Sequence, residues 1–139
     1  MFRRILVPVD FTTKNRAALD AACLLAADTQ SRVILLHVIE KIDYLPAKEL
    51  KMFYRDLQDR AREKLKVTAS LIAEQDIHVQ QKLLGGHRVQ TILDFARKNR
   101  VDLIVMSSHK VDLKKPVQGW GTISYRVAIL SQCPVLLVK

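Results

Sequence analysis

The stretch "ILVPVD" (Ile5–Asp10) decides the fold class, because it is a short apolar run rich in branched side chains that ends on a carboxylate. A run of this length and composition is typical of a strand that is covered on both faces. Such a strand needs helices above and below it. We therefore expect Ile5–Asp10 to be a buried strand of a parallel sheet.

After this stretch, segments with helix and strand patterns alternate along the chain. Strands that alternate with helices require crossover connections, which place helices on both faces of a parallel sheet. The chain of 139 residues is therefore predicted to form a single doubly wound α/β domain over residues 1–139. The further predicted strands are 32–39, 77–84, 102–106 and 134–138, and the predicted helices are 12–28, 47–75, 88–99 and 123–130.

Two details of the helices are also predicted. Thr12 and Thr13 stand at the start of the first predicted helix and have the side chains that commonly cap a helix start. The long segment 47–75 is predicted to be one amphipathic helix, because apolar residues recur in it at three-to-four spacing. The residues expected to face inward are Leu50, Phe53, Leu57, Ala61, Leu65, Ala69 and Ile72.

The composition limits the class of protein. Apolar residues make up 49% and charged residues 27%, which is a globular balance. The apolar runs are too short to span a bilayer and the start has no secretory pattern, so no membrane association and a cytoplasmic location are expected. The net charge of +9 raises the question of nucleic acid. Because many of the basic residues alternate with acids, as in 48–66, they indicate solvated helix faces, and a nucleic-acid partner is not expected.

The segment "MSSHKVDLKKPVQGWGTIS" (Met106–Ser124) is the exception, since it carries three lysines against one acid. It also closes on Gly-Trp-Gly-Thr just before a helical pattern, as a phosphate-binding loop does. In doubly wound sheets, ligands bind beyond the carboxyl ends of the strands, where the winding reverses. That rule selects the loops after Val9, Ile39 and Met106.

Four stretches, in this order, resemble the universal stress protein family. They are "RRILVPVDFT" for the first strand ending in Asp, "VILLHVIE" for the second strand, "LLGGHRVQTILDFARKNRVDLIVM" for a glycine turn, helix and fourth strand, and "GTISYRVAILSQCPVLLVK" for the last helix and strand. The resemblance covers nearly the whole chain and is weakest in the long second helix. It implies a flavodoxin-like, Rossmann-like three-layer sandwich with a five-stranded parallel sheet in the order 3-2-1-4-5. It also implies a homodimer paired through the last strand, 134–138.

The family has a branch that binds ATP through Gly-x-x-Gly, nine residues and Gly-Ser/Thr, and a branch that lacks this motif. This sequence lies between the two. Ser107 stands where the first glycine would be and Lys110 where the second would be, and the spacing to Gly121-Thr122 is one residue longer than the pattern. Alternatively, Gly119 is the closing glycine. If the position of Lys110 requires a left-handed backbone, a residue other than glycine costs about 1–2 kcal/mol there.

The resemblance implies a set of candidate nucleotide contacts, with ATP or AMP and Mg²⁺ as the ligands. Asp10 either faces the nucleoside or caps the turn that follows it. His109 is a candidate phosphate contact, whereas His37 is interpreted as a satisfied histidine of a strand. The candidate residues are Pro8, Val9, Asp10, Val38, Met106, Ser107, His109, Lys110, Gly119, Gly121, Thr122 and Ile123.

The sequence favours a regulatory or interaction module of the stress response that is not an enzyme and whose protein partner is unknown. The alternative is a nucleotide sensor that binds ATP or AMP through the loop 107–122. The sequence has no G-x-S-x-G motif, no Walker lysine motif and no cysteine or histidine cluster at metal-ligand spacing. No catalytic residue and no metal site are therefore expected.

Overall fold

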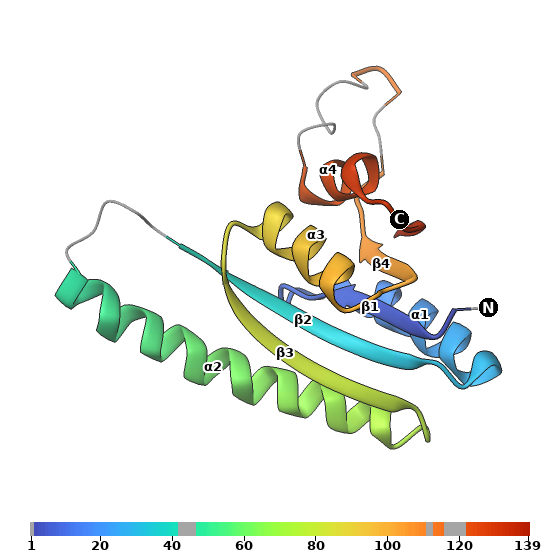
Figure 1. The fold of residues 1–139 in the computed structure, drawn as a ribbon, viewed down its shortest axis with the longest axis horizontal. Helices are drawn as coiled ribbons and strands as arrows, with labels where there is room; N and C mark the ends of the chain where they lie inside the picture. The colour runs from blue at the N-terminus through green and yellow to red at the C-terminus, as the bar shows by residue number, and fades with distance from the viewer. Residues whose placement is uncertain (1, 42–46, 111–112, 116–121) are drawn as a thin grey trace.

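The computed structural model describes residues 2–41, 47–110, 113–115 and 122–139. Within them, a five-stranded parallel sheet in the order β3-β2-β1-β4-β5 lies between helices on both faces, as predicted (Figure 1). No helix in these ranges is both long and apolar enough to cross a membrane. The elements are β1 (Arg4–Pro8), α1 (Asn15–Thr29), β2 (Arg32–Glu40), α2 (Ala47–Ala73), β3 (His78–Gly86), α3 (Arg88–Lys98), β4 (Leu103–Ser107), α4 (Ile123–Leu130) and β5 (Val135–Val138).

Strand β1 is buried from Ile5 to Pro8 because helices cover both faces of the sheet there. Ile5, Leu6 and Val7 have no exposed surface. Ile5 and Val7 pack in the cluster formed with α1 and α2, and Leu6 packs in the cluster formed with α3 and α4. Successive side chains of a strand point to opposite faces, so a strand with two covered faces needs a continuous apolar run. This explains the composition of the opening stretch.

Helix α1 begins at Asn15, and the predicted threonine caps are wrong. The residue before the helix is Lys14, and no side chain caps the helix start. Instead, Thr12 is part of a turn, in which its Oγ1 donates to Asp10 Oδ1 at 2.7 Å. The chain needs this turn to change direction between β1 and α1, so the helix starts later than its pattern suggests.

Helix α2 buries a shorter stripe than predicted. Ala61, Leu65 and Ile72 are buried, but the side chain of Phe53 is 46% exposed. At 27 residues, α2 is about 40 Å long. Figure 1 shows its amino-terminal end lying beyond strand β3, so the first turns have no sheet to cover.

Strand β3 continues through the glycine pair that was expected to end it. Ile39 pairs with Gly85 and Glu40 with Gly86 along the edge of β2. Gly86 has a φ of 148°, a conformation that residues with a Cβ rarely adopt. A Cβ at this position would lie 2.5 Å from Thr91 Oγ1, whereas a Cβ at Gly85 would have only ordinary contacts, the nearest at 3.5 Å. Gly86 therefore allows the chain to turn from β3 into α3.

We predict that Gly86→Ala lowers the free energy of unfolding by about 1–3 kcal/mol, because it forces a strained backbone conformation. Gly85→Ala is the matched control and should change stability little. Urea unfolding followed by circular dichroism measures both. Equal midpoints for the two variants would contradict the assigned role of Gly86.

Candidate functional site

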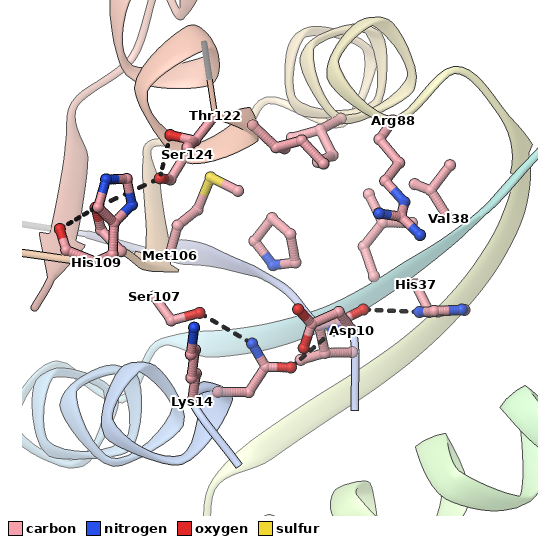
Figure 2. Close-up of a pocket in the computed structure, with 17 residues that line it drawn as sticks. Asp10, Lys14, His37, Val38, Arg88, Met106, Ser107, His109, Thr122 and Ser124 are labelled. Atoms are coloured by element: carbon pink, nitrogen blue, oxygen red, sulfur yellow. Dashed lines mark hydrogen bonds between the residues drawn. The ribbon is translucent and has the colours of Figure 1, made fainter. Parts of the chain in front are cut away.

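A cavity of about 440 Å³ lies at the carboxyl ends of β1, β2 and β4. The winding of the sheet reverses between β1 and β4, which is where ligands bind in folds of this kind. Its walls also include the starts of α1, α3 and α4 (Figure 2). The volume falls within the range of about 300–1,000 Å³ that is usual for small-molecule sites.

Most residues predicted for the site line this cavity. Lys110 is exposed and is not among the residues that line the cavity, so its contact with a ligand stays a prediction. It is also not among the described residues with a left-handed φ, so the cost considered for it does not arise. Gly119 and Gly121 lie outside the described residues. The predicted residues that line the cavity are Pro8, Val9, Asp10, Val38, Met106, Ser107, His109, Thr122 and Ile123.

Asp10 caps the turn that follows β1 and also lines the cavity. Its Oδ1 accepts hydrogen bonds from the backbone N–H of Thr12 at 2.9 Å and from the hydroxyl of Thr12 at 2.7 Å. The capping interpretation is therefore confirmed. No described residue donates to Oδ2 of Asp10, so a contact with a ligand remains compatible with the cap.

Asn15 was not identified from the sequence, yet it joins the two strand ends that flank the cavity. Its side chain is buried, and its Oδ1 accepts from the backbone N–H of Asp10 at 2.7 Å and of Phe11 at 3.1 Å. Its Nδ2 donates to Ser107 Oγ at 3.0 Å, across from the end of β4. Phe11 has a left-handed φ of 65°, so this amide also holds a strained turn. The hydroxyl at the first motif-glycine position is thus a partner of Asn15.

One side of the cavity is suited to an anion. It carries the hydroxyls of Ser107, Ser108, Thr122 and Ser124 and the ammonium of Lys14. Among the residues that the structure describes, no side chain caps the start of α4, whose first residues line the cavity. Backbone N–H groups and the positive end of a helix dipole attract anions at such a start.

The other side of the cavity is apolar apart from two nitrogen-bearing side chains. Leu36, Val38 and Ile92 on this side belong to the core cluster beneath α3 and α4, whereas Met106 of the same cluster lies beside Ser124 (Figure 2). His37 and Arg88 complete this side. Flat apolar walls of this kind suit an uncharged ring more than a phosphate.

His37 is a satisfied strand histidine, as interpreted from the sequence. Its Nδ1 lies 2.7 Å from the carbonyl oxygen of Val9 and must donate, because a carbonyl only accepts. Burial lowers the pKa of His37, and the nearby Arg88 and Lys64 charges lower it further, while the Val9 carbonyl and Asp10 act in the opposite direction. The ring is therefore neutral near pH 7 and carries its proton on Nδ1.

His109 is held in place by the end of the chain. The hydroxyl of Tyr125 donates to the carbonyl oxygen of His109 at 3.0 Å, and Lys139 Nζ donates to the same hydroxyl at 2.6 Å. The hydrogen bond from Lys139 lowers the pKa of Tyr125. These contacts fix the backbone after β4 against α4 and β5. A phosphate contact of His109 remains a prediction.

Lys14 and Arg88 are further cavity residues that the sequence reasoning missed. Each stands at the start of a helix that follows a strand, Lys14 before α1 and Arg88 as the first residue of α3. In a parallel sheet these positions gather at the ligand-binding edge. The same rule therefore predicts the helix starts as cavity residues, in addition to the strand ends that were identified.

The comparisons with known proteins agree with this fold. The model of the universal stress protein family matches residues 1–139. The chain belongs to the universal stress protein family. Its curated relatives include universal stress protein YxiE of Bacillus subtilis, which is 28% identical over 149 residues that cover both chains fully.

Solved structures of universal stress proteins have the same fold. UspA from Lactobacillus plantarum matches with a TM-score of 0.82 at 23% identity, over 99% of this chain and 98% of that one. A universal stress protein from Archaeoglobus fulgidus in complex with dAMP matches with a TM-score of 0.72 at 19% identity, over 99% and 98% of the two chains. At these identities the likeness concerns the fold.

We predict that Asn15 and Ser107 are energetically coupled. Asn15→Ala should lower the free energy of unfolding by about 1–3 kcal/mol, because it leaves buried N–H groups without an acceptor. Ser107→Ala should cost less. A double-mutant cycle in urea should then give a coupling energy of about 0.5–3 kcal/mol. Strictly additive effects would contradict a direct link between the two strand ends.

Proposed function

We propose that this universal stress protein is a regulatory module that binds a mononucleotide in the cavity between β1 and β4. The observation that supports this is the division of one cavity into an apolar side and an anion-binding side. Of the two functions expected from the sequence, the cavity favours the nucleotide sensor.

The two sides match the two ends of a nucleotide. A base presents flat apolar faces that pack well against Leu36, Val38 and Ile92. A phosphate needs donors and positive charge, which Lys14, the serine hydroxyls and the start of α4 offer. Asp10 lies between, at the end of β1, where a ribose would be expected. The relative that holds dAMP supports a nucleotide as the ligand class.

We propose further that the site binds nucleotide without hydrolysing it. Asp10 is the one carboxylate among the described residues that line the cavity, and its Oδ1 is engaged by Thr12. His37 donates from Nδ1 to Val9 and could accept a proton only at Nε2, and it lies with Val38 on the apolar side, across the cavity from the hydroxyls that would hold phosphate (Figure 2). We therefore propose that His37 does not serve as a base for water attacking the phosphate, and that Oδ2 of Asp10 faces the ribose or a magnesium ion instead. If Mg²⁺ accompanies a triphosphate, Asp10 is the oxygen ligand that this wall offers.

Nucleotide binding should stabilise the protein against heat. A nucleotide at about 100 times its Kd should add about 2.7 kcal/mol to the free energy of unfolding. We predict that Lys14→Met weakens AMP, GMP and ATP binding about tenfold or more, because a charge-assisted hydrogen bond to phosphate is lost. The nucleosides adenosine and guanosine should bind equally well to both proteins.

Thermal unfolding and isothermal titration, each with and without Mg²⁺, measure these effects. Lys66→Met is the matched control, since Lys66 is an exposed residue of α2 that does not line the cavity. No shift with any of the nucleotides at millimolar concentration would refute the proposed ligand class. Release of phosphate from the added ATP would refute the proposal that the site does not hydrolyse nucleotide.

We also propose that two copies pair through the edge of β5. This strand lies at the end of the sheet, and the side chain of Leu136 is 40% exposed on it. An apolar strand edge without a partner is a site of uncontrolled association, and closed pairing with a twin removes it.

Leu136→Lys should therefore convert a dimer into a monomer, because the pairing would bury a charge. Size-exclusion chromatography with light scattering measures the mass of both forms. Leu71→Lys is the control, since Leu71 is 57% exposed on α2, which packs against β3 at the opposite edge of the sheet. A wild-type protein that is monomeric at high micromolar concentration would refute this pairing.

A further inference from the structure

Two cations lie on opposite sides of the cavity. Figure 2 shows Lys14 and Ser107 on one side and Arg88 and Val38 on the other. Lys14 belongs to the anion-binding side described above. Arg88 is placed differently, because it projects from the start of α3 over the apolar side.

Glu40 orients the guanidinium of Arg88. The Oε2 atom of Glu40 lies 3.5 Å from Nε of Arg88 and accepts the backbone N–H of Arg88 at 3.3 Å. The other oxygen, Oε1, lies 3.6 Å from Nδ1 of His87. Glu40 thus engages the inner nitrogen of the guanidinium. No described residue accepts a hydrogen bond from its two outer nitrogens, Nη1 and Nη2.

The outer edge of a guanidinium presents parallel N–H donors, which match a pair of adjacent acceptors. Guanine has such a pair in O6 and N7. Adenine has N7 next to the N6 amino group, so one donor of the arginine would face another donor. An arginine beside a bound base therefore distinguishes the two purines.

We propose that Arg88 makes this cavity prefer guanine nucleotides over adenine nucleotides. This inference rests on the proposed function, since it needs a nucleotide whose base lies on the apolar side. The alternative role for Arg88 is a phosphate contact. That role fits the structure less well, because Glu40 already balances its charge and the hydroxyls and Lys14 lie on the opposite side.

The test is the affinity of GMP and AMP for three forms of the protein, measured by isothermal titration. The wild type should bind GMP about tenfold more tightly than AMP. Arg88→Met keeps the length of the side chain without its donors and should remove the difference. Arg88→Gln should reverse it, because a carboxamide pairs with N6 and N7 of adenine. Arg97→Met is the control on the same helix, since Arg97 does not line this cavity.

Each outcome separates this inference from the proposed function. If both nucleotides bind the wild type equally, or AMP binds more tightly, the proposed function stands and the role of Arg88 is refuted. If Arg88→Met weakens GMP and AMP by the same factor, Arg88 contacts the phosphate and the inference is again wrong. If neither nucleotide binds the wild type, the proposed function fails and this inference fails with it. Thermal unfolding of Arg88→Met in buffer alone verifies that the variant is folded.

Discussion

The side chain of Asn15 forms the hydrogen bonds on which the rest of the site depends. In the parallel sheet, β1 pairs with β4 only at Ile5 and Leu6, which lie opposite Leu103 and Ile104. Beyond these two pairs, the carboxyl ends of the two strands separate. Asn15 spans the divergent ends, because its amide accepts from the turn after β1 and donates to Ser107. A buried side-chain amide whose oxygen and nitrogen are both hydrogen-bonded restricts the distance between its two partners and their orientation. Asn15 thus ties the turn after β1 to the end of β4 at the switch point.

This arrangement changes the meaning of the missing motif glycines. A glycine at the position of Ser107 would let a phosphate approach the backbone, but it would leave Nδ2 of Asn15 without this acceptor. The serine keeps the amide satisfied and adds a hydroxyl to the cavity wall. Lys110, at the second position, does not line the cavity and has no left-handed φ. In the described wall, the starts of α1, α3 and α4 supply polar groups in addition to Ser107.

The fold could be predicted from the sequence because both faces of β1 are buried. The continuous apolar run of Ile5, Leu6 and Val7 is a direct consequence of that burial. The strand ends of the site followed from the same reasoning. Asn15 and Arg88 could not be identified in this way, since their roles depend on contacts with Ser107 and Glu40, which are distant in sequence. The exposure of Phe53 was missed for a related reason: periodicity identifies the face of a helix that is apolar, but not how far the sheet beneath it extends.

For binding in the cavity, the positions of individual basic residues matter more than the net charge of the chain. A net charge of +9 would favour any polyanion, yet among the described residues that line the cavity two are cations, Lys14 and Arg88, and each has a different environment. Lys14 lies among hydroxyls near a helix start, where the surrounding dipoles add to its attraction for an anion. Arg88 is paired with Glu40, so its net field is small and its directional donors remain. Of the two cations, Lys14 therefore attracts an anion at one side of the cavity, and Arg88 offers directional donors that can distinguish one base from another at the other side.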